Sequence, residues 1–279
     1  MRRILWLALF GVSCLSATSA LVSFQQPAPA ATAPAVAQAK KPSSSKIWVS
    51  RHAEFEEFLR TAEIERETTV SVGVLGIKRV YFKPGGLAAS AALRSIRPAK
   101  YNGFWESYKS EIAVYRLDRL LELDMVPPTV ERRHGGETVS LQLWSENMRM
   151  LGEVQKQKLS PPDVDAYNFQ LRRQKVFQNL VGNLDPNQGN ILFDPVWNVV
   201  LIDFSRALTN SRALKFEATA IDRPFLDRIK ALNRDALRRE MGDFVEPGAV
   251  DALLARRDEI VKTFEKLAKE KGAGQVLLP

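Results

Sequence analysis

The sequence predicts an α+β protein of two lobes, with a β-rich first lobe and a mostly helical second lobe that contains one β-hairpin at the cleft. Up to about residue 145, short runs that alternate apolar and polar residues predict strands. From residue 146 onward, apolar residues recur at helical spacing outside a single hairpin. We therefore expect one lobe over 47–145 and another over 146–279, with a ligand site in the cleft between them.

The N-terminal region differs from the rest of the chain. Met1-Arg2-Arg3 precedes an uncharged run over 4–15 and small residues up to Ala20, which is the layout of a secretory signal peptide over 1–20. The apolar run over 4–24 is also about long enough to be an uncleaved membrane anchor. Both interpretations predict export of the body to a periplasm, a secretory lumen or the extracellular space. Residues 21–46 are rich in Pro and Ala and predict a disordered linker.

The composition excludes several classes of function. The chain has 45% apolar and 26% charged residues, as expected of globular material. Its only cysteine is Cys14 and it has two histidines, so we expect neither a zinc site nor a Cys/His nucleophile pair. The net charge of +8 is scattered along the chain, which suits an anionic partner such as a nucleotide and equally suits simple solubility. No segment is typical of a nucleic-acid-binding module.

The first lobe is expected to contain two pairs of strands and two helices. Pro127-Pro128 ends the second helix, because proline cannot continue the hydrogen-bond ladder. Alternation of Val139, Leu141 and Leu143 with polar residues indicates a half-buried strand. The expected elements are a helix over 54–62, strands over 68–74 and 78–83, a helix over 104–123, and strands over 129–132 and 138–144.

The second lobe is expected to be helical around one hairpin. Pro161-Pro162-Asp163 is a helix-start signal. The turn over 194–198 joins two apolar runs, which predicts a hairpin. The expected elements are helices over 164–181, 224–239 and 248–271, and hairpin strands over 191–193 and 199–204.

Three polar residues around the hairpin carry the functional signal. Asn190 follows Asp185 by five positions, and Asp203 follows Asn190 by thirteen. Phosphoryl transfer requires groups that orient a hydroxyl and hold metal ions against the phosphates. Carboxylate and amide oxygens are the ligands that suit Mg²⁺. The spacing therefore indicates a phosphotransferase site.

The same residues resemble a known family. The Asp185 to Asn190 spacing matches the catalytic loop of protein kinases, and Asp203-Phe204-Ser205 is similar to their metal-binding Asp-Phe-Gly tripeptide. The segments Gly182 to Leu192, Tyr108 to Glu111 and Val126 to Val130 resemble the atypical branch of the superfamily. That branch includes phosphoinositide kinases, HipA-type kinases and secretory Golgi casein kinases.

The resemblance implies a bilobal protein-kinase-like fold and a role for each matching residue. Lys83 would bind the nucleotide phosphates and Glu111 would fix its ammonium group. Asp185 would be the catalytic residue that accepts or orients the proton of the acceptor hydroxyl, and Asn190 and Asp203 would hold Mg²⁺. Trp144, or residues just after it, would border the adenine at the junction of the lobes.

These roles predict an exported, Mg²⁺-dependent kinase that moves the γ-phosphate of ATP to a hydroxyl group. The expected partners are a nucleoside triphosphate and an acceptor that is a protein Ser or Thr, a lipid headgroup or a small molecule. The alternative is a catalytically degenerate kinase-like module that binds nucleotide or acts as a scaffold. Asn183 and Leu184 replace the His-Arg pair of regulated kinases, so we expect no switch driven by activation-loop phosphorylation.

Overall fold

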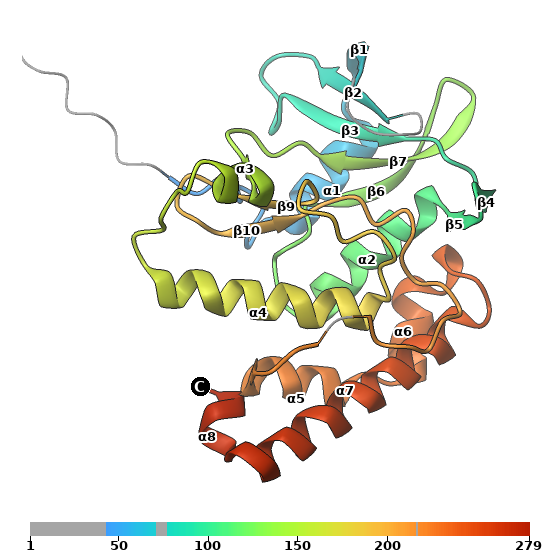
Figure 1. Cartoon of the computed structure of the whole chain (residues 1–279). Helices are drawn as coiled ribbons and strands as arrows, with labels where there is room; N and C mark the ends of the chain where they lie inside the picture. The colour runs from blue at the N-terminus through green and yellow to red at the C-terminus, as the bar shows by residue number, and fades with distance from the viewer. Residues whose placement is uncertain (1–42, 71–76, 216) are drawn as a thin grey trace, which may run out of the picture. The chain divides into compact units, whose positions relative to one another are not determined.

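A five-stranded antiparallel sheet with the order β1-β2-β3-β7-β6 forms the first part of the structure (Figure 1). The computed structural model describes residues 43–70, 77–215 and 217–279, all within the compact unit 41–279. The strands are β1 (Ile64–Thr69), β2 (Ile77–Phe82), β3 (Ser90–Arg94), β6 (Thr129–His134) and β7 (Glu137–Leu143). Helices α1 (His52–Thr61) and α2 (Tyr108–Leu120) pack against β6 and β7.

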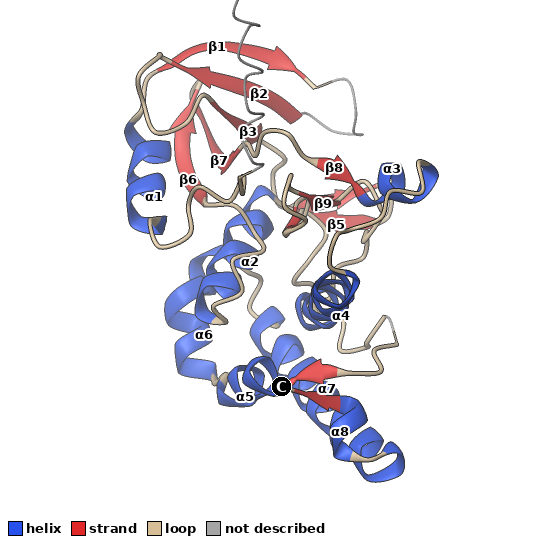
Figure 2. Cartoon of the chain, turned by 90° about the vertical axis from the view of Figure 1, so that its left-hand side faces the viewer, coloured by secondary structure: helices blue, strands red, loops and turns tan. Residues whose placement is uncertain are grey.

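The second part is mainly helical, and Figure 2 shows its helices α4 to α7 on the side away from the outer strands β1 and β2. The helices are α3 (Leu151–Lys156), α4 (Val164–Val181), α5 (Arg223–Ala231), α6 (Arg234–Met241), a 3-10 turn (Gly242–Phe244), α7 (Ala249–Lys271) and α8 (Ala273–Val276). A three-stranded sheet contains β8 (Arg149–Met150), β9 (Ile191–Phe193) and β10 (Val199–Leu201). Two short pairs complete the strands: β4 (Ala99–Tyr101) with β5 (Phe104–Glu106), and β11 (Ile221–Asp222) with β12 (Leu277–Leu278).

The β9–β10 hairpin lies between two hydrophobic cores. Leu192 and Val200 belong to the core under the large sheet, while Phe193 and Leu201 belong to the core of the helical part. Because successive side chains of a strand point to opposite faces, one hairpin contacts both cores. Each buried side chain of this size stabilises the fold by about 1.5–3 kcal/mol. The hairpin is therefore held firmly at the junction where the predicted site residues lie.

The expected α+β architecture is confirmed, with helix 164–181 matching α4 at both ends. Several details differ, among them the first strand, which is β1 (Ile64–Thr69) and not a strand over 68–74. Residues 104–106 form β5, and the helix begins only after Ser107, whose side chain caps it by accepting a hydrogen bond from Lys109 N. The helix predicted over 224–239 is two helices, because Asn233 caps a new one. Strand β3 lies in a segment that the sequence predicts as a connection. Its small residues weaken the sequence pattern that indicates a strand.

Several sequence predictions concern residues outside the described part of the chain. They are the leader over 1–20, the anchor over 4–24, most of the linker, and the end of the strand predicted over 68–74. Residues 43–46, predicted as the end of the linker, contact the folded body: Ser44 Oγ donates to Asp194 at 2.6 Å. The buried Asp194 carboxylate requires such donors. Among the described helices, none is both long and apolar enough to cross a membrane.

Candidate functional site

A cavity of about 570 Å³ lies between the large sheet and the β9–β10 hairpin. Its volume is within the usual range for small-molecule sites. Part of its lining is apolar and suits a flat heterocycle. The apolar residues include Ile77, Leu143, Trp144, Met148, Leu192 and Ile202. The rest is polar and charged, and includes Arg94, Glu106, Asp185, Asn190, Asp203 and Arg206. The predicted residues Asp185, Asn190, Asp203 and Trp144 thus line one cavity.

The loop that carries Asp185 begins at a glycine. Gly182 ends α4 in the left-handed region, with φ of 61°, and a β-carbon there would meet the Arg256 side chain at 2.8 Å. Glycine is therefore required both by the backbone conformation and by the close contact. Beyond it, Asn183 Oδ1 accepts a hydrogen bond from Asp185 N at 3.1 Å, and Asn190 Nδ2 donates to Asp185 O at 3.2 Å. These bonds define the path of the loop.

The hairpin brings Asn190 and Asp203 together. Ile202 N donates to Asn190 O at 3.1 Å, so the two predicted metal ligands stand on neighbouring strand ends. Asp203 has a φ of 63°, which costs a non-glycine residue conformational energy and is typical of functional positions. Phe204 is fully buried against Phe177, with ring centroids 6.1 Å apart, which anchors Asp203 to the helical core.

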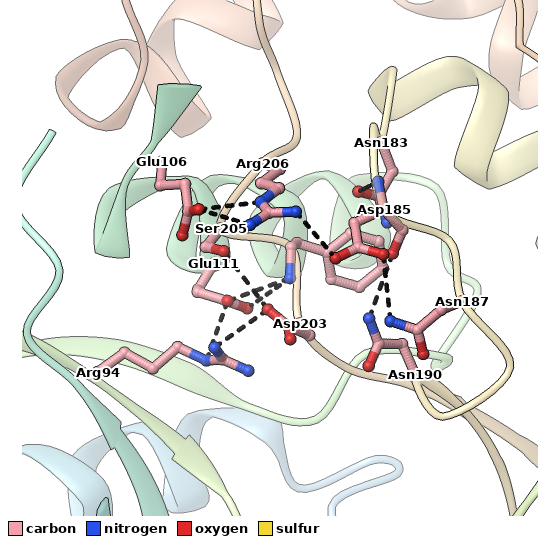
Figure 3. A network of polar contacts seen from close by, with 11 residues as sticks. Arg94, Glu106, Glu111, Asn183, Asp185, Asn187, Asn190, Asp203, Ser205 and Arg206 are labelled. Atoms are coloured by element: carbon pink, nitrogen blue, oxygen red, sulfur yellow. Dashed lines mark hydrogen bonds and ion pairs between the residues drawn. The ribbon is translucent and has the colours of Figure 1, made fainter. Parts of the chain in front are cut away.

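Glu111 forms an ion pair with Arg94, and Figure 3 shows this pair beside Asp203. Arg94 Nε lies 3.1 Å from Glu111 Oε1, and Arg94 Nη1 lies 3.0 Å from Asp203 Oδ1. Both Glu111 oxygens also accept from Phe204 N at 3.1 Å. Burial raises the pKa of Glu111 to about 7, against the lowering effect of Arg94. The Arg94 guanidinium thus connects β3 of the large sheet with Glu111 on α2 and with Asp203, a predicted metal ligand.

The predicted pairing of Lys83 with Glu111 is wrong. Lys83 Nζ lies 2.7 Å from Glu63 Oε1, its side chain is 58% exposed, and it does not line the cavity. The strand register explains this. In the antiparallel β2–β3 pair, Arg94 stands opposite Ile77, at the start of β2, whereas Lys83 follows the end of β2. The two basic residues therefore lie at opposite ends of the pair, and only Arg94 is near the cavity.

Glu106 and Arg206 are further polar residues of the cavity that the sequence analysis did not identify. Arg206 donates to Glu106 through Nε at 3.0 Å and Nη2 at 2.8 Å, and its Nη1 donates to Asp185 at 3.2 Å. Local signals for both exist: Glu106 directly precedes the capping Ser107, and Arg206 directly follows Asp203-Phe204-Ser205. The local signal for Arg94 is that it is the charged residue directly after the uncharged run Ser90 to Leu93.

The polar residues of the cavity fit a divalent cation. Around Arg94 and Arg206 stand four carboxyl groups, those of Glu106, Glu111, Asp185 and Asp203, so acidic groups outnumber the cationic ones. Asn190 uses its amide nitrogen on Asp185 O, which leaves its amide oxygen as an additional ligand. Within the described residues, no group of three or more His, Cys, Asp or Glu side chains could hold a metal. In proteins, Mg²⁺ is usually bound through one or two carboxylates and completes its shell with phosphates and water.

The antiparallel sheet, the buried pair between β3 and α2, and the hairpin that presents Asn190 and Asp203 define an atypical protein-kinase-like fold. The solved structure of a Golgi casein kinase with Mn/ADP bound is similar, with a TM-score of 0.64 and 14% identity over 82% of this chain and 79% of the other. A hydra Fam20 structure with sugar gives a TM-score of 0.62 and 14% identity over 81% of this chain and 91% of the other. No protein-family model matches the chain, and no curated protein is significantly similar to it in sequence.

Proposed function

We propose that this chain is a Mg²⁺-dependent phosphotransferase that moves the γ-phosphate of ATP to a hydroxyl acceptor. One observation carries the proposal: Asp185, Asn190 and Asp203 line the same cavity as the Arg94 guanidinium, which Glu111 holds in place. Phosphoryl transfer depends almost entirely on such positioning and charge stabilisation. The similar fold of a kinase solved with Mn/ADP supports a nucleotide in this cavity.

In this proposal each residue has a distinct task. Arg94, rather than Lys83, binds the phosphate oxygens, and Glu111 orients its guanidinium. Asp185 accepts the proton of the acceptor hydroxyl as the new oxygen–phosphorus bond forms and the bond from the γ-phosphorus to ADP breaks. Asn190 and Asp203 would hold Mg²⁺, which supplies neutralising charge to the phosphates when bound.

Two acceptor classes deserve the first assays. A casein kinase and a sugar-bound protein are among the similar structures, so we propose a protein hydroxyl or a sugar hydroxyl as the acceptor. Lipid headgroups and other small polyols come next, because the fold alone does not specify the acceptor.

A degenerate nucleotide-binding module is the second candidate, and one observation favours it. Arg94 contacts Asp203 directly, so a guanidinium neutralises the carboxylate that is proposed to hold the metal. In a binding module this ion pair would persist, whereas in the enzyme it must yield to the metal and the phosphates.

The purified full chain incubated with γ-labelled ATP and Mg²⁺ separates the two candidates. Casein, a panel of free sugars and the chain itself serve as acceptors, and label transfer is measured for wild type, Asp185→Ala and Asp203→Ala. The enzyme transfers label, and both substitutions lower the rate by at least about 10²-fold. Nucleotide binding without transfer, unchanged in Asp185→Ala, identifies the binding module and contradicts the enzyme.

We also propose that the protein acts outside the cytoplasm. The basic start, the apolar run over 4–15 and the small residues before 21 support this proposal. Expression of the full chain with a C-terminal epitope tag, followed by cell fractionation, tests it. A chain that lacks residues 2–20 should stay in the cytoplasm, and equal cytoplasmic retention of both forms would refute export.

A further inference from the structure

Arg206 connects the catalytic loop to a different part of the fold. Its Nη1 donates to Asp185 Oδ2 at 3.2 Å, while Nε and Nη2 both donate to Glu106 Oε1 (Figure 3). The guanidinium carbon also lies 4.8 Å from the centroid of the Phe104 ring. Glu106 and Phe104 belong to β5, which lies 100 residues away from Arg206 in sequence.

Contacts of both its side chain and the neighbouring backbone hold Arg206 against β5. Glu106 is buried, with 4% of the residue exposed, and directly precedes the helix cap Ser107. The backbone of Ser107 donates to Ser205 O at 2.9 Å, immediately before Arg206. The side chain of Arg206 and the backbone just before it are therefore both bound by the same junction.

Asp185, in contrast, depends on its neighbours for orientation. It stands in a loop, with a side chain that is 38% exposed. Asn187 Nδ2 donates to its Oδ1 at 3.1 Å and Arg206 donates to its Oδ2. Asn187 lies in the same loop, so Arg206 is the donor that ties this carboxylate to a distant, buried element.

We propose that Arg206, held by Glu106, is a positioning residue that orients the Asp185 carboxylate toward the acceptor hydroxyl. This inference rests on the proposed function, because the orientation matters only if Asp185 receives a proton. A donor on Oδ2 and another on Oδ1 restrict rotation of the carboxylate and leave its remaining lone pairs for the acceptor. A displacement of about 1 Å in a reacting group costs about 10²-fold in rate. The role is distinct from that of Arg94, which contacts Glu111 and Asp203.

The experiment compares full-length wild type, Arg206→Gln, Arg206→Lys and Glu106→Gln. Initial rates of label transfer from ATP with Mg²⁺ give kcat and KM, displacement of a fluorescent nucleotide gives Kd, and thermal unfolding gives Tm. We expect Arg206→Gln to lower kcat about 10²-fold, while KM and Kd for ATP change less than about threefold. Arg206→Lys should recover part of the rate, and Glu106→Gln should have an intermediate effect, because the cation remains but is held less firmly.

Two further arms show whether Arg206 acts through Asp185. On an Asp185→Asn background, Arg206→Gln should cause no further loss of the residual rate, since residues that act as a unit are not additive. Guanidinium ion added at tens of millimolar should restore part of the rate of Arg206→Ala. Arg173→Gln is the matched control: Arg173 makes a similar two-bond pair with Asp222 but does not line the cavity. It should lower Tm and leave kcat within about twofold of wild type.

A purely structural role predicts other results. If Arg206→Gln lowers Tm, nucleotide affinity and kcat in parallel, or if the loss is as large in Asp185→Asn as in wild type, the positioning role is wrong. These outcomes require an active wild type. If the wild type transfers no label to any acceptor or to water, the proposed function itself fails and the inference falls with it.

Discussion

Arg94 and Lys83 lie at opposite ends of the β2–β3 pair, and the proposed function assigns phosphate binding to Arg94. Arg94 is 11% exposed and held by Glu111, whereas Lys83 forms an exposed pair with Glu63. Surface pairs of that kind contribute little to stability. A guanidinium also differs from an ammonium group, since its planar fork binds two phosphate oxygens at once. In the proposed function, the nucleotide site is therefore built around an arginine.

The first prediction compares these two residues. Arg94→Ala should weaken nucleotide binding about 10- to 100-fold, because it removes a charge-assisted contact and leaves Glu111 buried without its cation. Lys83→Ala should change the affinity by less than about twofold. Displacement of a fluorescent nucleotide measures both. A large effect of Lys83→Ala together with a small effect of Arg94→Ala would show that the cavity is not the nucleotide site.

The second prediction concerns Asp118, a fully buried carboxyl group on α2. Burial raises its pKa to about 7, and the charge of Lys46 opposes this rise only partly. Since the native state holds this proton more tightly than the unfolded state, the native state binds more protons between about pH 4 and 7. The contribution of Asp118 to stability therefore falls as the pH rises through that window.

Asp118→Asn removes this titration. Its stability relative to wild type should rise between pH 4 and pH 7.5, by on the order of 1 kcal/mol per pH unit at most. Urea unfolding at several pH values measures the difference. Asp227→Asn, at an exposed position, is the control. A difference between Asp118→Asn and wild type that stays constant with pH would contradict the prediction.

At the scale of elements, the start of α2 holds the segment that follows Asp203. Ser107 N donates to Ser205 O, Glu106 accepts from Arg206, and Glu111 accepts from Phe204 N. Three consecutive residues of the segment are thus bound by one helix start. The capped first turn of α2 therefore determines where Asp203 stands.

The third prediction tests this coupling with two helix caps. Ser107 caps α2 by accepting from Lys109 N, and Asp163 caps α4 by accepting from Ala166 N. Replacement of either by Ala should lower the free energy of unfolding by about 0.5–2 kcal/mol. Only Ser107→Ala should also lower nucleotide affinity, because its helix turn holds the site. Chemical unfolding and nucleotide titration measure the two effects, and equal loss of affinity in both variants would refute the coupling.

At the scale of the whole folded unit, the cavity lies where two separate cores meet. Its lining comes mainly from strands of the large sheet and from the β9–β10 hairpin with its flanking loops, and includes Glu106 of β5. A ligand that contacts both sides stabilises the native state by mass action, since it binds only the folded chain. From the excess of carboxyl groups, we expect nucleotide binding under the proposed function to depend on a divalent cation.

The fourth prediction is a metal-dependent rise in thermal stability. ATP with Mg²⁺ at about 100 times Kd should stabilise the full chain by about 2.7 kcal/mol. Excess EDTA should remove this gain, and Asp203→Ala should not show it. Differential scanning fluorimetry with and without chelator measures the shift. An equal rise in Tm with ATP alone would show that the cavity binds nucleotide without the metal.

The sequence by itself determined the features that depend on short stretches of chain. Asp185, Asn190 and Asp203 lie in one loop and one hairpin, so their spacing alone places them together. The bounds of α4 follow from its cap and its apolar period. The weak signals were short strands such as β3 and β5, where small or exposed residues obscure the alternation.

Only the tertiary structure decided which distant charges meet. Glu111 pairs with Arg94 instead of Lys83 because the register of an antiparallel strand pair, set by the packing of its apolar face, brings one end of β3 to the cavity. Arg206 reaches Glu106, which is 100 residues away in sequence, because packing places the start of α2 beside the segment that follows Asp203. Local patterns encode the conformation of a segment, whereas contacts between segments depend on how their buried faces pack.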